Sequence, residues 1–203
     1  MLSLEEGTFL VRLARSTVTK YLKESKKPVP PQPPSPRLYE KSGAFVTIEK
    51  LIGKERILRG CIGYPLPHFP LIEAVMESAI SAALEDPRFP PLKIDELKEV
   101  VFEVSILTPP TLLRVNDPKE YPKRIRVGRD GLVVEMGFYK GLLLPQVPVE
   151  YGWDEETFLS ECCMKAGLPP DSWLSRDLKV YVFTAEVFTE VSPGGEVIQK
   201  RLV

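Results

Sequence analysis

Apolar side chains recur with a helical period in three segments of the chain. Ser3 and Glu6 form a capping box before the first segment, which predicts that a helix begins there. Pro87 ends the second segment, and Gly167 follows the third as a C-terminal stop. We therefore expect helices over residues 4–25, 71–84 and 154–166.

Between the helices, short runs rich in β-branched and aromatic residues alternate with turn residues, as strands do. They predict strands over residues 45–49, 57–62, 100–107, 125–127, 132–136, 142–144 and 179–190. Six prolines within residues 28–36 instead predict an extended polyproline II connector on the surface. The alternative for this segment is a ligand for SH3-type domains, but proline-rich segments more commonly serve as spacers.

The order of these elements predicts an α+β fold with an internal repeat. Each half has strands, a helix, a Pro-Pro pair and then a strand that contains Glu-Val, at an offset of roughly 80 residues. We expect one domain, residues 1–203, built from related halves at about 1–110 and 111–203. Two such halves leave a cleft between them, which is where ligands tend to bind.

Composition narrows the class of protein. The net charge of −1 disfavours general nucleic-acid binding, which needs a basic surface. No apolar run approaches the roughly 20 residues of a membrane span, and the N-terminus lacks the features of a signal peptide. We therefore expect a cytoplasmic protein with no membrane contact. Twenty-one prolines, against one asparagine and three glutamines, suit a thermophile.

Three cysteines and one histidine show no metal-ligand spacing, so we expect neither a metal nor a cofactor. Cys162 and Cys163 are expected to pack on the apolar side of the third helix. The remaining cysteine lies in the sequence LRGCIG, residues 58–63. In an extended backbone Arg59, Cys61 and Gly63 point to one face. The guanidinium then favours the thiolate form of Cys61, although burial is the commoner fate of a lone cysteine.

LRGCIG resembles the signature of the AMMECR domain family, which occurs from archaea to animals. Further stretches are similar to it in the same order: GAFVT at 43–47, DPRFPP at 86–91, FEVSIL at 102–107, GRDG at 128–131, GLLLPQ at 141–146 and KAGLP at 165–169. The resemblance implies a duplicated α+β unit with one strongly curved, barrel-like, mostly antiparallel sheet flanked by helices. It also implies a shared pathway with a Memo-type partner and a radical-SAM protein, because such proteins often accompany family members.

Two groups of residues are candidates for the chemistry of this chain. Cys61 is the candidate nucleophile, with a base to be supplied by His68, the sole histidine, or by a buried glutamate (Glu103, Glu135 or Glu186). Arg59, Arg88 and Gln146, with Gly60, Gly63 and Gly141 giving access to the backbone, form a candidate pocket for a phosphate or carboxylate. The alternative for Arg88 is a structural ion pair with Asp86.

The two halves differ where the hexapeptide occurs. The first half carries Arg59-Gly60-Cys61, whereas residues 143–145 of the second, Leu-Leu-Pro, stand at about the same place without a charge. A strand that only supports the fold has no need of the charge, so this asymmetry favours a functional site at Cys61.

Three hypotheses for function follow. The first is a small-molecule or peptide-binding site around Arg59-Gly60-Cys61 in a Cys61-dependent enzyme. The second is a binding or adaptor module that docks a protein on the same face. The third is RNA binding through the basic residues of segment 119–129, which the overall charge disfavours.

Overall fold

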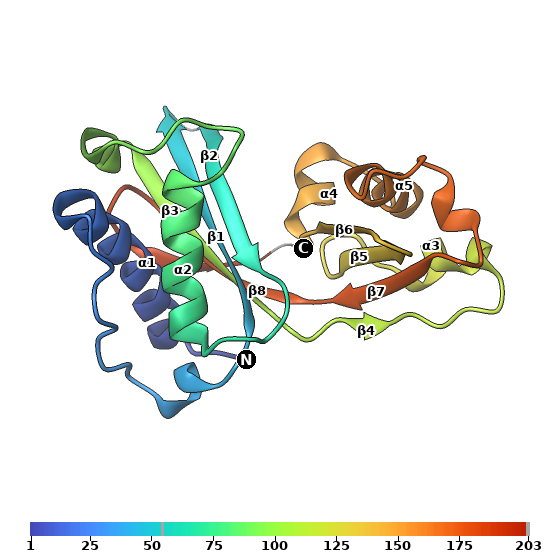
Figure 1. Cartoon of the computed structure of the whole chain (residues 1–203), viewed down its shortest axis with the longest axis horizontal. Helices are drawn as coiled ribbons and strands as arrows, with labels where there is room; N and C mark the ends of the chain where they lie inside the picture. The colour runs from blue at the N-terminus through green and yellow to red at the C-terminus, as the bar shows by residue number, and fades with distance from the viewer. Residues whose placement is uncertain (54, 202–203) are drawn as a thin grey trace. The chain divides into compact units, whose positions relative to one another are not determined.

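The computed structural model describes residues 1–53 and 55–201, which form two compact units (Figure 1). Unit 1 comprises Met1–Leu107 and Glu186–Lys200, and unit 2 comprises Thr108–Ala185. The helices are α1 (Leu4–Glu24), α2 (Leu71–Leu84), α3 (Tyr121–Arg124), α4 (Gln146–Tyr151) and α5 (Glu155–Lys165), with short 3₁₀ helices η1 (Pro36–Tyr39), η2 (Ile94–Lys98), η3 (Pro118–Glu120) and η4 (Ser172–Leu174).

Unit 1 is built on a five-stranded sheet with the strand order β2-β1-β3-β8-β9. Its strands are β1 (Gly43–Ile52), β2 (Glu55–Tyr64), β3 (Val100–Leu107), β8 (Ala185–Glu190) and β9 (Val197–Lys200). Alternate residues of β1, such as Val46 and Ile48, pack with Phe102 and Val104 of β3 into one core with α1 and α2. Both helices therefore cover the same face of this sheet, and they contact each other (Figure 1).

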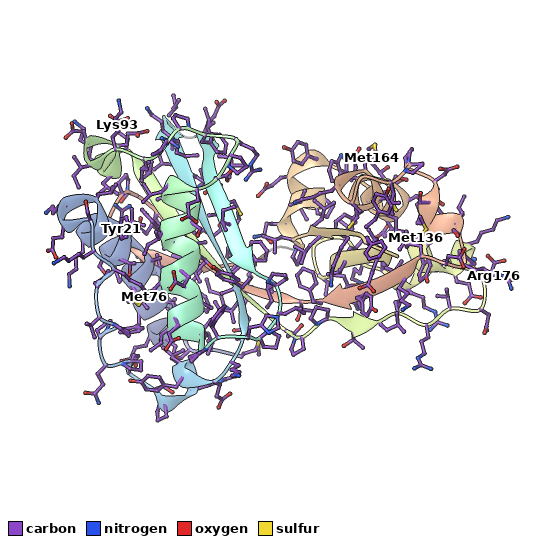
Figure 2. The ribbon with its side chains drawn as sticks, viewed as in Figure 1. Tyr21, Met76, Lys93, Met136, Met164 and Arg176 are labelled. Atoms are coloured by element: carbon purple, nitrogen blue, oxygen red, sulfur yellow. The ribbon has the colours of Figure 1, made fainter. Side chains whose placement is uncertain are left out.

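Unit 2 has a four-stranded sheet with the order β4-β7-β5-β6. Its strands are β4 (Thr111–Leu112), β5 (Gly131–Met136), β6 (Tyr139–Leu143) and β7 (Lys179–Phe183). Leu132 and Val134 of β5 pack against Phe158 and Leu159 of α5, and this second core is separate from that of unit 1. Figure 2 shows the side chains of both units, with Met76 of α2 and Met136 of β5 among the labelled residues.

The two units share one connectivity, which supports the predicted repeat. In unit 1 the chain runs β1, β2, α2, β3 and gives the order β2-β1-β3; in unit 2 it runs β5, β6, α5, β7 and gives β6-β5-β7. A glycine occupies the same place in each. A Cβ on Gly60 of β2 would lie 2.1 Å from the Ala82 carbonyl oxygen of α2, and one on Gly141 of β6 would lie 2.6 Å from the Cys162 carbonyl oxygen of α5. Descent of the halves from a duplication stays a prediction.

This correspondence changes the alignment of the halves made from the sequence. If Gly60 matches Gly141, the counterpart of Arg59-Gly60-Cys61 is Lys140-Gly141-Leu142, three residues earlier than the Leu-Leu-Pro at 143–145. The thiol remains specific to the first half, but the charge does not, because a lysine takes the place of the arginine.

The α+β class is confirmed, with antiparallel sheets flanked by helices. In place of one curved, barrel-like sheet, the described residues form two sheets, and neither closes into a barrel. The predicted strand over 179–190 is divided at Thr184 into β7 and β8, which belong to different sheets. A strand that leaves one sheet for another keeps an uninterrupted apolar pattern, so the sequence does not reveal the break.

Unit 2 departs from the sequence prediction at two further places. Residues 125–127, predicted as a strand, follow the short helix α3 in a turn, where the Asp130 carboxylate accepts the Arg126 N–H at 2.9 Å. Residues 146–151, for which the sequence predicted neither a helix nor a strand, form α4, which ends at Gly152 in the left-handed conformation. The three long helices lie where they were predicted, and residues 28–36 connect α1 to η1.

A buried ion pair ties the C-terminal part of unit 1 to its first helix. Glu190 of β8 is fully buried and accepts hydrogen bonds from Arg15 of α1 at 2.7 and 2.5 Å and from the Phe102 N–H at 3.1 Å. The same guanidinium donates to the carbonyls of Leu97 and Val100. Because β8 follows unit 2 in the chain, this carboxylate fixes the returning strand in the sheet of unit 1.

Replacing Glu190 by Gln should lower the free energy of unfolding by about 3 kcal/mol, because it leaves the buried Arg15 without its counter-charge. Urea unfolding followed by far-UV circular dichroism measures the change. Glu77→Gln, which breaks the exposed pair with Lys27, is the control and should cost less than about 1 kcal/mol. Equal losses in the two variants would contradict a special role for the buried pair.

We expect Gly60→Ala and Gly141→Ala each to cost about 1–3 kcal/mol, since the added methyl group meets a helix carbonyl at less than contact distance. Trp153 and Trp173, the two tryptophans, both lie in unit 2, so tryptophan fluorescence should report the Gly141→Ala loss directly. Far-UV circular dichroism should report the Gly60→Ala loss. Unchanged unfolding of either variant would show that its helix can retreat from the strand at no cost.

Candidate functional site

The hexapeptide LRGCIG lies in β2, which forms an edge of the unit 1 sheet. The residue-by-residue pairing of β2 with β1 is interrupted once. Ile48 of β1 pairs with Gly60 but Glu49 pairs with Leu58, so Arg59 is the additional residue of a β-bulge. Gly60 faces α2, and Ile62 packs against the core beneath that helix. Cys61, between them, points to the opposite face of the sheet.

The bulge directs Arg59 to a partner outside the sheet. Its Nε and Nη2 atoms donate to the two carboxylate oxygens of Glu96 in η2 at 3.0 and 3.1 Å, and its side chain is only 12% exposed. The Arg59 hydrogen bond lowers the pKa of Glu96 from its ordinary value, against the opposing effect of burial. Arg59 therefore has an ion-pair role that joins β2 to η2, and its predicted role in binding an anion stays a prediction.

Cys61 is half-buried, and its thiol meets a hydroxyl group. Thr47, directly opposite on β1, donates from Oγ1 to the Cys61 sulfur at 3.2 Å. At the same residue, the Cys61 N–H donates to Oδ2 of Asp86 at 2.9 Å, and Nη2 of Arg88 donates to the Cys61 carbonyl at 3.4 Å. The loop that follows α2 thus binds both backbone groups of Cys61, as a neighbouring strand would.

Asp86 and Arg88 form one tightly bound pair. Arg88 donates to Asp86 from its backbone N–H at 3.1 Å, from Nε at 2.9 Å and from Nη2 at 2.7 Å. These hydrogen bonds, above all those of the guanidinium, together with the Cys61 N–H, lower the pKa of Asp86 to about 2 although burial acts in the opposite direction. The Asp86 side chain is 2% exposed, whereas that of Arg88 is 54% exposed. The structural ion pair considered as the alternative for Arg88 is therefore present, and it also holds the guanidinium beside Cys61.

The two glycines of the hexapeptide are explained by packing inside unit 1. A Cβ on Gly60 would strike the end of α2, as described above. A Cβ on Gly63 would lie 2.3 Å from both the Ala44 carbonyl oxygen and the ring of Phe45. Gly63 is paired with Phe45, so the aromatic ring crosses the glycine. Access of a ligand to their backbone stays a prediction.

The remaining candidates lie apart from this group in the chain. Gln146 is the first residue of α4 in unit 2 and is buried. His68 is exposed in the loop between β2 and α2. Cys162 and Cys163 are fully buried in the second core, and burial raises the pKa of their thiols to about 12 and about 11. Both therefore stay protonated near neutral pH, which agrees with a packing role.

Thr47 was not identified from the sequence as part of the site, and Asp86 was identified only as a helix stop and ion-pair partner. Thr47 ends the family-like stretch GAFVT, but its position opposite Cys61 depends on the register between β1 and β2. That register includes a bulge, which the residue pattern does not show. In residues 1–53 and 55–201, no group of three or more His, Cys, Asp and Glu side chains is arranged to hold a metal.

Comparison with known proteins identifies relatives along the whole chain. The family model described as AMMECR1 matches residues 11–188. Protein PH0010 of Pyrococcus horikoshii is 56% identical over 200 residues, covering 98% of this chain and 97% of the relative. Protein MJ0810 of Methanocaldococcus jannaschii is 56% identical over 203 residues, covering 100% and 99%. The crystal structure of the uncharacterized protein PH0010 matches with a TM-score of 0.93 at 55% identity, covering 97% of each chain.

These matches confirm the resemblance inferred from the motifs. Both relatives come from thermophilic archaea, which agrees with the proline-rich, amide-poor composition. The described part of the chain also contains no helix with the length and apolar character that crossing a membrane requires.

Asp86→Asn should remove a pH-dependent part of the stability. The pKa of Asp86 lies below its ordinary value, so its contribution is present above about pH 4 and is lost as the pH falls through about 2. A shift of this size corresponds to about 2 kcal/mol, which urea unfolding between pH 5 and pH 2 should detect in the native protein and not in the variant. Arg88→Gln, which keeps the carboxylate but removes its strongest hydrogen bonds, should give an intermediate loss. A native-like acid dependence in Asp86→Asn would refute this assignment.

Proposed function

Since the chain belongs to the AMMECR1 family, we propose that its function is carried by Cys61 and Arg88, which bind a small anionic molecule or the carboxylate of a peptide beside a reactive thiol. The observation that carries this proposal is the Asp86–Arg88 pair. The pair holds the Arg88 guanidinium beside the backbone of Cys61, and the guanidinium remains half-exposed. Cys61 is also the one cysteine of the three that is not fully buried.

The guanidinium suits an anionic group. Asp86 engages one edge of Arg88, through Nε and Nη2, and so sets the plane of the guanidinium. Arginine carries five donors and remains charged, and its planar fork matches carboxylate and phosphate oxygens. Arg59 is less suited to this task, because its side chain is mostly buried against Glu96.

The thiol differs in its surroundings from the other two cysteines of the chain. The Thr47 hydroxyl donates a hydrogen bond to the Cys61 sulfur, and such a bond favours the ionised, nucleophilic form. Cys162 and Cys163 are buried among apolar side chains, where the ionised form is disfavoured. A thiolate can add to a carbonyl carbon of a bound anionic molecule: the sulfur–carbon bond forms as the electron pair of the C=O π bond moves onto oxygen, which then takes a proton from water. This makes a Cys61-dependent modification reaction the favoured activity.

A binding or adaptor role is the second candidate, because two consecutive apolar side chains of β2 are exposed. Ile57 and Leu58 of β2 are 47% and 38% exposed. In an adaptor, Cys61→Ser would leave association with a partner intact, whereas Arg59→Glu would abolish it. A Memo-type partner, a radical-SAM protein and a cytoplasmic location stay predictions. RNA binding gains no support from Arg124 and Arg129, which form ion pairs with Glu120 and Asp130.

The proposal predicts that Arg88 raises the rate at which Cys61 reacts with an anionic reagent, relative to the rate with a neutral reagent of the same kind. Alkylation by iodoacetate and by iodoacetamide is followed by mass spectrometry of the Cys61 peptide in the folded protein. We expect Arg88→Gln to lower the iodoacetate-to-iodoacetamide rate ratio about threefold, as removal of a charge about 6 Å away in water implies. The ratio cancels any change in the ionisation of the thiol, because both reagents need the thiolate.

Arg129→Gln is the matched control. Arg129 binds Asp130 through the same two atoms, at 2.8 and 2.6 Å, and its side chain is 50% exposed, but it belongs to unit 2. It should leave the rate ratio unchanged. If Cys61 reacts only after unfolding, the reactive thiol is refuted; if Cys61 reacts but Arg88→Gln leaves the ratio unchanged, the anion site is refuted.

A further inference from the structure

A row of polar side chains crosses the sheet of unit 1 on the face opposite α1 and α2. Cys61 of β2 is paired with Thr47 of β1, and Thr47 is paired in turn with Glu103 of β3. Partners in a register share a face of the sheet, so the three side chains lie on one side. Lys200 of β9 reaches the same place, with its Nζ atom 3.3 Å from Oε2 of Glu103.

The neighbouring positions show that this face is distinct from the core. The residues of β1 on either side of Thr47, Val46 and Ile48, pack with α1 and α2, as do the neighbours of Glu103, Phe102 and Val104. Thr47 and Glu103 are nevertheless buried, at 9% and 2% exposed. A nucleophile, a hydroxyl, a carboxylate and an ammonium group thus come from four of the five strands, with β8 lying between β3 and β9.

A buried carboxylate is costly to a fold unless it is paired and hydrogen-bonded. An apolar residue at 103 would continue the apolar pattern of β3, which is buried along its whole length. The fold therefore gains little from an ionisable group at this position. Its place in the row suggests that Glu103 acts on the Cys61 thiol.

We propose, on the basis of the function proposed above, that Glu103 and Lys200 are positioning residues that set the ionisation of the Cys61 thiol. Glu103 lies two strands from Cys61, or about 10 Å between backbones at the usual strand spacing. At that distance its negative charge disfavours the thiolate. Lys200, bound to Glu103, offsets this charge, while Thr47 stabilises the thiolate by direct hydrogen bonding.

Other charged groups also face this region and must be kept constant in any test. Asp86 and Arg88 bind the backbone of Cys61, and Arg59 with Glu96 adjoins it along β2. On β1 the next residue of the same face, Glu49, is paired with Arg56 at 2.9 Å. Since these pairs are neutral as units, single changes at Glu103 or Lys200 should dominate the difference between variants.

The test measures the pH midpoint of Cys61 alkylation by iodoacetamide in the folded, full-length protein. Lys200→Met removes the ammonium group bound to Glu103 and should raise the midpoint by about one pH unit; Glu103→Gln removes the negative charge and should lower it by a similar amount. The double variant should return close to the native value. Thr47→Val removes the direct donor and should also raise the midpoint.

Lys50→Met and Glu99→Gln are the controls. They break an exposed lysine–glutamate pair, at 2.9 Å, between β1 and the residue before β3, and they should not move the midpoint. Circular dichroism establishes that each variant is folded. If one single variant is not folded, the other single variant is compared with the double variant, and the midpoint difference measures the effect of one charge.

The outcomes separate this inference from the function on which it rests. Opposite shifts in Lys200→Met and Glu103→Gln, with recovery in the double variant, support the positioning role. Equal midpoints in the native protein, Lys200→Met, Glu103→Gln and their double variant refute the role, although Cys61 remains a reactive thiol. If the folded native protein shows no alkylation of Cys61, the proposed function and this inference both fail.

Discussion

The close approach of α2 to β2 at Gly60 is the constraint on which the candidate site depends. With no Cβ at this position, the carbonyl of Ala82 can lie against the strand. The helix then ends beside the hexapeptide, so Asp86, four residues after Ala82, reaches the N–H of the residue next to Gly60. Pro87 ends the helix, and the missing side chain of Gly60 lets that end lie close enough to β2 for the Asp86 carboxylate to bind the Cys61 N–H.

Unit 2 has the same constraint but not the site that follows from it. Gly141 allows α5 to approach β6 as Gly60 allows α2 to approach β2. There, however, the positions four and six residues after Cys162 hold Ala166 and Leu168 instead of an aspartate and an arginine, and Leu142 takes the place of Cys61. The shared architecture thus accounts for the glycines, and only the residues added to it in unit 1 require a functional explanation. Those residues are Cys61, Asp86 and Arg88.

The parts of this structure that depend on local pattern could be predicted from the sequence. The capping box at Ser3 and Glu6 and the apolar stripe of residues 71–84 place α1 and α2 correctly, because both signals come from neighbouring residues. The contact of Thr47 with Cys61 could not be predicted, since it depends on a register with a bulge. The division at Thr184 was also hidden, because a change of sheet leaves the strand pattern intact. The ion pair between Arg59 and Glu96 could not be predicted either, because the two residues are 37 positions apart in the chain.

Two of the buried carboxylates of unit 1, Glu190 and Glu103, are paired in different ways. Glu190 is held by the planar fork of Arg15, which also binds two backbone carbonyls, so the pair links α1, the 3₁₀ helix η2 and two strands. Glu103 is paired with Lys200, whose ammonium group lies at the end of a flexible chain and whose side chain is 31% exposed. A rigid arginine pair fixes geometry, whereas a partly exposed lysine pair leaves a charge that a bound molecule can alter. The role that we propose for Glu103, in the row that begins at Cys61, would make use of such a charge.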